Sequence, residues 1–282
     1  MRARVPGSAA NLGPGFDTLA LALALYVEVE IEPASALVVK SEGEGADLPI
    51  DDQHLAVRIA KEVVGHDRLS ISIKSDIPLA RGLGSSAALA VATAAAAGVD
   101  DPLVLATRFE GHCENAAASV MGGLVTATMV GDRPVATPLF LDPDLVFVAL
   151  VPAQGLPTSV ARQALPTEVP LEDAVFNLGR LGWLIAALGD ASGMDPEVMA
   201  DRLHQRQRTA LFPESEVLIS ELIEGGASAA CWSGAGPTLL GLCVGEDRAE
   251  RVLKAAERAM RAHGVDGEAY IVEPDMAGLH VE

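Results

Sequence analysis

The chain has 282 residues, half of them hydrophobic, which is enough for a large folded core and excludes a disordered segment. Its formal net charge of -19 excludes a nucleic-acid surface, because phosphate backbones need clustered cations, although a small anionic ligand needs only a local positive site. The apolar runs are interrupted by Gly, Pro or charged residues well before they reach the length of a membrane span.

The first half of the chain predicts a mixture of strands and helices. Residues 27–32 alternate between Val or Ile and Glu, and residues 69–73 alternate in the same way, which is typical of strands with one wet face. The predicted elements are a strand over 19–31, a helix over 54–64, a strand at 69–73, a buried helix over 87–97, a helix over about 102–119, and strands near 124–130 and 145–151.

The second half has more helices. It predicts helices over 156–164, 171–188, 196–206 and 215–224, a strand pair at 229–232 and 238–244, a helix over 246–263 and a last strand at 268–272. Strands and helices alternate without a regular βαβ order, which favours an α+β fold over a doubly wound sheet. The higher predicted helix content after about residue 150 predicts two domains, 1–150 and 151–282.

A glycine loop leads into the alanine-rich helix. Residues 78–88 read Pro-Leu-Ala-Arg-Gly-Leu-Gly-Ser-Ser-Ala-Ala, with Ser85 and Ser86 where a helix N-cap belongs. Backbone amides and the positive end of the helix dipole would converge there, which suits a phosphate chain. An ordinary tight turn into a helix explains the same residues. The segment also fits the dinucleotide pattern G-x-G-x-x-A, but no apolar strand directly precedes it and no Walker lysine follows the glycines.

A second segment, residues 5–17, is rich in Gly and Pro and is predicted to be an irregular loop. It carries Asn11 and Asp17. Loops of this kind present groups to ligands, although such residues also satisfy their own backbone in turns.

A third segment, residues 110–115, places Glu110, His112 and Asn115 near the end of a helix. Each of these residues alone is an ordinary surface or structural group. Together, beside a loop for phosphate, they suit a site for Mg²⁺. A fourth segment, residues 232–238, predicts a hairpin with close backbone packing.

The cysteines and the N-terminal residues indicate the cellular compartment in which the protein is expected. Cys113, Cys231 and Cys243 are odd in number and widely spaced, without a CxxC, which predicts free thiols in a reducing cytosol. No long apolar segment follows the N-terminal residues, so we expect no secretory signal and a cytoplasmic protein.

Together, the four segments resemble the GHMP kinase family, which includes galactokinase, homoserine kinase, mevalonate kinase and phosphomevalonate kinase. The opening at residues 8–17 is closest to the homoserine kinase branch, residues 78–88 match the family's phosphate loop, and residues 233–238 match its third motif. The likeness covers nearly the whole chain, including residues 177–180 and 201–213.

The resemblance implies two α+β domains with the active site between them. The first would resemble a domain of ribosomal protein S5, and the second would be ferredoxin-like. The implied reaction is transfer of a phosphoryl group from ATP, with Mg²⁺, to the side-chain hydroxyl of L-homoserine on the way to threonine. A homodimer is expected from the same likeness.

The resemblance also implies roles for individual residues. The ATP-binding residues would be Pro78, Leu79, Ala80, Arg81, Gly82, Leu83, Gly84, Ser85, Ser86, Ala87 and His54. Ser86 and Glu110 would hold Mg²⁺. The amino end of L-homoserine would contact Asn11 and Asp17, and its carboxylate would contact Arg162 and Arg208. Two fork-shaped cations suit one planar carboxylate, although surface ion pairs are the alternative. The residues near the reacting hydroxyl would be Asn115, Thr158 and His112, the last also binding substrate.

Three departures from the family pattern stand out. His112-Cys113-Glu114-Asn115 replaces the usual His-Pro-Asp-Asn, His54-Leu55-Ala56 replaces the usual Asn-Leu-Val near adenine, and Gly7 replaces a bulkier residue. Mevalonate kinases have an Asp at the position of Asn115. An amide cannot act as a base, so the resemblance implies catalysis by positioning and charge neutralisation.

Three alternatives stay open: another small-molecule kinase of the family, a non-catalytic nucleotide-binding member, and an NAD-binding protein. Arg162, Arg208 and Asp17 together favour an amino acid over mevalonate, which has no amino group. The presence of Ser86 and Glu110 favours a catalytic member.

Overall fold

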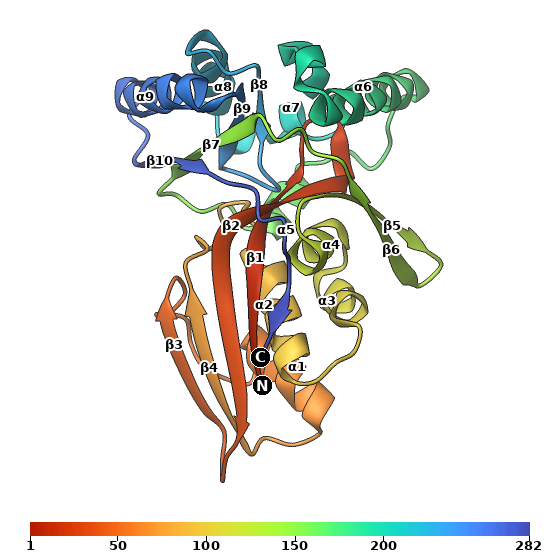
Figure 1. Ribbon diagram of the computed structural model, residues 1–282, viewed down its shortest axis with the longest axis vertical. Coiled ribbons are helices and arrows are strands. Elements are labelled where there is room, and N and C mark those ends of the chain that lie inside the picture. The colour runs from red at the N-terminus through yellow and green to blue at the C-terminus, as the bar shows by residue number, and fades with distance from the viewer.

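The computed structural model describes all residues from 1 to 282, and they form two β-sheets with helices packed against them (Figure 1). The elements of the first sheet and its helices are β1 (Arg2–Asn11), β2 (Gly15–Pro33), β3 (Val38–Gly43), α1 (Leu55–Val64), β4 (Leu69–Ser75), α2 (Ser85–Ala96), α3 (Pro102–Glu110), α4 (Glu114–Met121), β5 (Leu124–Val130), β6 (Arg133–Leu139) and β11 (His280–Val281). The strand order is β11-β1-β2-β4-β3, with β5 beside β2 and β6 beside β5. Only β3 and β4 run parallel.

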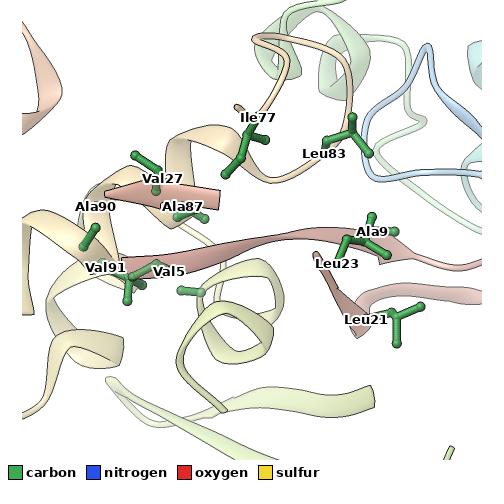
Figure 2. Packing of buried hydrophobic residues seen from close by; sticks show 14 of the residues in the cluster. Val5, Ala9, Leu21, Leu23, Val27, Ile77, Leu83, Ala87, Ala90 and Val91 are labelled. Atoms are coloured by element: carbon green, nitrogen blue, oxygen red, sulfur yellow. The ribbon is translucent and has the colours of Figure 1, made fainter. Parts of the chain in front are cut away.

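The core of this part lies between the sheet and α2. The helix has nine buried residues, most of them alanine, and its small side chains let it lie directly on β1 and β2. Figure 2 shows Ala87, Ala90 and Val91 of the helix beside Val5 and Val27 of the strands. The predicted burial of this helix is therefore confirmed for most of its residues, whereas Ser85 is half-buried and Ser86 is exposed at its start.

The second sheet contains β7 (Leu145–Pro152), β8 (Ala229–Trp232), β9 (Leu239–Val244) and β10 (Gly267–Val272) in the antiparallel order β10-β7-β9-β8. The helices of this part are α5 (Thr158–Gln163), α6 (Leu171–Gly189), α7 (Gln205–Arg208), α8 (Ser215–Glu224) and α9 (Glu246–Ala262), with short 3₁₀ turns at Ala191–Gly193, Pro196–Met199 and Thr209–Leu211. Helices lie between the first and second strands and between the third and fourth. This β-α-β-β-α-β order and the strand order are those of the expected ferredoxin-like fold.

The strand that contains residue 150, β7, belongs to the second sheet alone. β7 begins at Leu145 and pairs only with β9 and β10, whereas β11 returns to pair with β1. The predicted domain boundary stays a prediction. The α+β class itself is confirmed.

The prediction of an irregular loop over residues 5–17 was wrong except at its centre, because residues 15–17 already belong to β2. Residues 2–11 form β1, which pairs with β2, and only the turn around residues 12–14 is irregular. A register shift between Pro6 and Gly7 accommodates a residue that has no amide hydrogen. Local composition rich in Gly and Pro disfavours a strand, but hydrogen bonds from the partner strand β2 stabilise it. A prediction from neighbouring residues alone therefore misses such strands.

Two predicted helices were also wrong. The helix over 102–119 is broken into α3 and α4 by Gly111, which ends α3 in a left-handed conformation with φ of 80°. The helix over 196–206 is a 3₁₀ turn at Pro196–Met199 followed by the short α7. The residues after the first break, His112, Glu114 and Asn115, line the cleft described below.

Four further findings concern the remaining elements and expectations. Helix α5 is shorter than predicted. Strands β3, β6 and β11 have no counterpart in the sequence reading. The three cysteines are free, as predicted, and all three are buried. Burial raises the pKa of Cys231 and Cys243 to about 12. None of the helices combines the length and apolar character that crossing a bilayer requires.

Candidate active site

The glycine loop between β4 and α2 is held by its carbonyl groups. The carbonyl oxygens of Ala80, Arg81, Gly82 and Leu83 each accept a hydrogen bond from another part of the chain; the respective donors are Leu156 N, Thr238 N, Ser233 Oγ and Ser8 N. The loop is therefore fixed on its carbonyl side by both halves of the protein.

The amide side of the same loop is free. No backbone N–H from Ala80 to Ala87 donates a hydrogen bond within the chain, including the first three residues of α2. These donors line a cleft with about 810 Å³ of empty space. A row of unpaired amides at the start of a buried helix is a binding site for an anion such as a phosphate chain.

The glycines of the loop serve packing within the protein. Gly82 and Gly84 have φ of 74° and 69°. A Cβ on Gly82 would overlap the carbonyl oxygen of Ser233, and a Cβ on Gly84 would overlap Oγ of Ser8. Gly7 is explained in the same way, because a Cβ there would lie 2.8 Å from the carbonyl oxygen of Leu83. These glycines let the loop approach β1 and the turn between β8 and β9.

The predicted serine N-cap was wrong. Gly84 is the N-cap of α2, and Ser85 and Ser86 are its first two helical residues. Ser86 is therefore free to donate from Oγ to Oε1 of Glu110, at 2.6 Å. A hydroxyl and a carboxylate side by side at the mouth of an anion site are oxygen ligands of the kind that Mg²⁺ prefers, so these residues fit the predicted metal.

Arg81, predicted to contact ATP, is held by the protein backbone. Its guanidinium donates to the carbonyl oxygens of Leu79, Pro152 and Ala153. The side chain therefore ties the glycine loop to the end of β7 and the residues after it.

A buried polar cluster lies at the break between α3 and α4. Glu114 is 1% exposed; its Oε1 lies 3.0 Å from Nδ1 of His112 and accepts a hydrogen bond from Nδ2 of Asn115. Oδ1 of Asn115 accepts in turn from Ser8 Oγ. Burial lowers the pKa of His112, but the hydrogen bond to Glu114 and its charge outweigh burial, so the pKa is raised overall. Asn115 is thus held at both ends of its amide.

Asp17 and Arg162 form a closed pair. Nη1 and Nη2 of Arg162 donate to the two carboxylate oxygens of Asp17 at 2.9 and 2.7 Å. The hydrogen bond and charge of Asp17 raise the pKa of Arg162 despite partial burial. Asn11 is also engaged: Oδ1 accepts from the Asp17 amide and Nδ2 donates to the Gly234 carbonyl.

Arg208 differs from Arg162 because no carboxylate pairs with it. It is 1% exposed and donates from Nη1 to the Gly234 carbonyl and to Nδ1 of His204, whereas its Nε has no partner. Burial lowers the pKa of this guanidinium to about 10, with Arg162 as a further cause. A buried, unpaired guanidinium at the cleft is a site for an anionic group.

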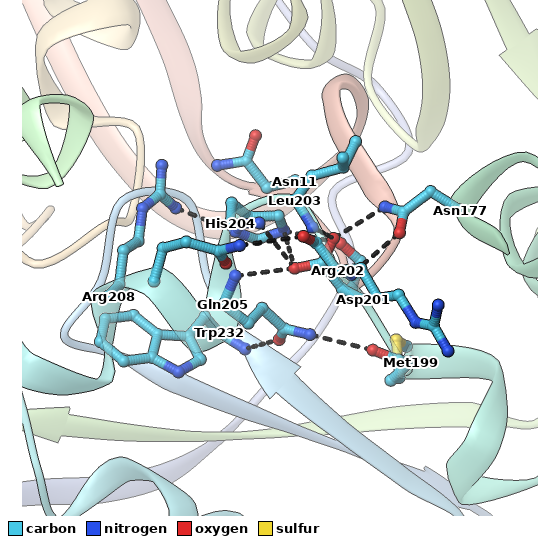
Figure 3. A network of polar contacts seen from close by, with 12 residues as sticks. Asn11, Asn177, Met199, Asp201, Arg202, Leu203, His204, Gln205, Arg208 and Trp232 are labelled. Carbon is cyan, nitrogen blue, oxygen red and sulfur yellow. Dashed lines mark hydrogen bonds and ion pairs between the residues drawn. The ribbon is translucent and has the colours of Figure 1, made fainter. Parts of the chain in front are cut away.

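His204 and Asp201 hold Arg208 in place (Figure 3). His204 is fully buried, and its Nε2 lies 2.6 Å from the Gly13 carbonyl oxygen, so Nε2 carries the proton and Nδ1 accepts from Arg208. Asp201 Oδ2 accepts from the amides of His204 and Gln205. This network joins α7 to the turn between β1 and β2.

The predicted site residues fall into two groups. The cleft is lined by Asn11, Pro78, Ala80, Arg81, Gly82, Leu83, Gly84, Ser85, Ser86, Ala87, Glu110, His112, Asn115, Thr158, Arg162 and Arg208, together with Glu114, Gly234 and Ala235. Leu79, Asp17 and His54 do not line it. Asp17 contacts it through Arg162, whereas His54 is the N-cap of α1. The individual roles of all these residues stay predictions.

Comparison with known proteins gives matches over both halves of the chain. Residues 53–123 match the family model described as GHMP kinases N terminal domain, and residues 174–262 match GHMP kinases C terminal. A homoserine kinase of Moorella thermoacetica is 39% identical over 279 residues, covering 93% of each chain. The chain belongs to the GHMP kinase family.

Two further comparisons extend this result. A homoserine kinase of Desulfitobacterium hafniense is 36% identical and covers 100% of this chain and 99% of its own. The crystal structure of a homoserine kinase from Cytophaga hutchinsonii superimposes with a TM-score of 0.87, covering 100% of this chain and 97% of that one at 24% identity. The family resemblance predicted from the sequence and the fold that it implied are thus confirmed.

Sequence reading of this GHMP kinase missed several residues at the site. Ser8, His204 and Gly234 were not singled out, although each makes a hydrogen bond with a predicted site residue. Asp201, which accepts from the amides of His204 and Gln205, was also missed. The spacing of four residues between His204 and Arg208 was a usable signal, whereas Asp201 lies in the non-helical segment before α7.

His204 is expected to make the stability of this GHMP kinase fall in acid. Burial lowers the pKa of His204 to about 4, below its ordinary value of 6.5, so the unfolded chain takes up a proton that the folded chain refuses. The contribution of neutral His204 to the free energy of unfolding is fully present above pH 6.5. It is lost as the pH falls toward 4, and the total loss is about 3 kcal/mol.

Denaturant unfolding across this pH range measures the effect. The variant His204→Gln, whose amide has both a donor and an acceptor, is expected to have a shallower decline than the parent. The exposed His66→Gln is the matched control and should keep the parental slope. An unchanged slope in His204→Gln would contradict the assignment.

Proposed function

We propose that this chain transfers the γ-phosphoryl group of ATP to the side-chain hydroxyl of L-homoserine, giving O-phospho-L-homoserine for threonine biosynthesis. The names of its relatives support this substrate, and one observation carries it: free amides for a phosphate chain and an unpaired, buried guanidinium for a carboxylate line one cleft.

The phosphate side of the reaction would use the start of α2. Free amides between Gly82 and Ala87 would bind the triphosphate without any rearrangement, because the loop carbonyls are already fixed. Ser86 and Glu110 would hold Mg²⁺, which would neutralise phosphate charge at this site.

The substrate side would use the opposite wall of the cleft. Arg208 would bind the carboxylate, and Asn115, Thr158 and His112 would lie near the reacting hydroxyl. Since the amide of Asn115 cannot accept a proton, we infer that positioning and charge neutralisation supply most of the rate, with the proton leaving late to phosphate or solvent.

The homodimer expected from the resemblance stays a prediction. Exposed apolar side chains on one face of α6, namely Leu171, Val175 and Leu178, support it, because contiguous apolar surface marks contact sites.

A coupled assay of ADP release tests the proposed function. We expect turnover that depends on both L-homoserine and Mg²⁺, and little turnover with mevalonate, which has no amino group. ATP binding without turnover on L-homoserine would instead favour a non-catalytic member of the family, and turnover on another hydroxyl compound would favour a different kinase.

A further inference from the structure

Arg81 joins the glycine loop to the segment that leads into α5. Its Nε donates a hydrogen bond to the carbonyl oxygen of Pro152 at 2.9 Å, and its two terminal nitrogens donate to the carbonyl oxygens of Leu79 and Ala153. Every acceptor is a backbone carbonyl, and none is a carboxylate. Three N–H groups of one guanidinium thus hold together segments that lie 72 residues apart in the sequence.

Two further contacts fix the same junction. The amide of Leu156 donates to the carbonyl oxygen of Ala80 at 2.8 Å, and Ala80 itself has a φ of 52°, which is uncommon for a residue other than glycine. A Cβ on Gly155 would lie 3.0 Å from Nη1 of Arg81 and 3.4 Å from the Cβ of Ala80. The segment therefore lies directly on Arg81, and its hydrogen bond helps to hold Ala80 in a strained conformation.

Helix α5 follows this segment and carries Thr158 and Arg162 to the lining of the cleft, at the junction of the two halves of the molecule (Figure 1). Of the six residues of α5, only Ala161 is buried. Near the end of the helix, Arg162 is paired with Asp17. The position of α5 therefore depends on the Arg81 junction before its start as well as on this ion pair.

The free amides of the glycine loop have supports of their own. The carbonyl oxygens of Gly82 and Leu83 accept hydrogen bonds from Ser233 Oγ and Ser8 N, and neither bond involves the Arg81 side chain. The row of amides that would bind the triphosphate therefore keeps these supports when the Arg81 guanidinium is removed.

We propose that Arg81 is a positioning residue for phosphoryl transfer, which fixes the start of α5 against the glycine loop and so places Thr158 and Arg162 relative to the nucleotide. This inference rests on the proposed function. The resemblance had assigned Arg81 to ATP, whereas the proposal makes it act on the amino-acid side of the cleft, although it lies in the phosphate loop.

The test measures kcat and KM for L-homoserine, and the Kd of ATP in the absence of L-homoserine, in the parent and in Arg81→Met. Methionine keeps an unbranched stem and has no N–H group. We expect kcat/KM for L-homoserine to fall by about 10- to 100-fold, because a displacement of about 1 Å of a positioning group has an effect of this size. The Kd of ATP should stay within about threefold of the parental value.

Three more variants sharpen this test. Arg81→Lys keeps the charge but not the planar fork, so it should restore only part of the loss. Gly155→Val leaves Arg81 in place and pushes the segment away from it, so kcat/KM for L-homoserine should fall by about fivefold or more while the Kd of ATP is kept. Arg133→Met is the matched control, because that arginine side chain is 76% exposed on β6, and it should behave like the parent.

Other outcomes overturn the proposal in distinguishable ways. If Arg81→Met raises the Kd of ATP by tenfold or more, about the loss of one charge-assisted contact, and leaves the KM for L-homoserine unchanged, Arg81 binds phosphate. If affinity for both ligands falls equally together with the unfolding temperature, Arg81 only stabilises the fold. Parental kinetics in Gly155→Val would contradict the proposal even if Arg81→Met fails to fold. If the parent binds ATP but does not phosphorylate L-homoserine, the proposed function fails, and this inference fails with it.

Discussion

Replacing Arg208 by alanine is expected to lower kcat/KM for L-homoserine by about 100- to 1,000-fold, because removing one partner of a buried charge pair costs about 2–5 kcal/mol. The loss should fall mainly on the KM for L-homoserine. Arg208 touches the expected amino-acid side of the cleft, whereas the amides for the nucleotide lie in a different segment, so the KM for ATP should change little.

The chain offers matched controls for this experiment. Arg206 lies on the same short helix, α7, but is exposed, so Arg206→Ala should behave like the parent. Arg208→Lys keeps the charge but loses the fork that binds both carboxylate oxygens, so it should restore only part of the activity. Equal losses in Arg206→Ala and Arg208→Ala, or a matching rise in the KM for ATP, would show that Arg208 has no specific role.

Replacing Gly82 by alanine is expected to damage both stability and nucleotide binding. The left-handed φ of 74° costs about 1 kcal/mol for alanine, and the new Cβ meets backbone atoms of Ser233 and Gly236 that cannot rotate away, which adds about 1–3 kcal/mol. The loop must shift, and displacement of its amides should raise the KM for ATP or lower kcat by at least about tenfold.

The variant Gly65→Ala is a control that separates backbone strain at a left-handed φ from steric overlap of a new Cβ. Gly65 also has a left-handed φ, of 81°, but a Cβ there meets nothing within 4 Å. It ends α1 and should cost only the strain of about 1 kcal/mol, with unchanged kinetics. Thermal unfolding and ATP titration of both variants make the comparison. If Gly82→Ala lowers stability and ATP binding no more than Gly65→Ala does, the tight packing of the loop contributes to neither.

Several features of the site could be predicted because they depend on residues that are close in sequence. The glycine loop, the alanine-rich helix and the Glu110–Asn115 cluster each carry a local signal. The positions of Ser86 and Glu110 beside each other agree with the expected metal pair, although no local rule joins residues on different helices.

Other features could not be predicted, because they are decided by contacts between distant segments. Local composition predicted a loop over residues 5–17. Pairing between β1 and β2 instead makes residues 5–11 part of β1 and residues 15–17 part of β2. Charge pairing was also misjudged. Asp17 and Arg162 are 145 residues apart, and nothing local indicates that they neutralise each other and leave Arg208 without a carboxylate partner.

The sequence by itself indicated the family through the resemblance of four motifs. It also predicted the α+β class and the position of the glycine loop before the alanine-rich helix, because these features depend on neighbouring residues. Only the tertiary structure decided which charges in the cleft are satisfied and which are free. Pairing depends on burial and on partners from both sheets, and a buried charge is stabilised or destabilised by whatever the fold brings next to it.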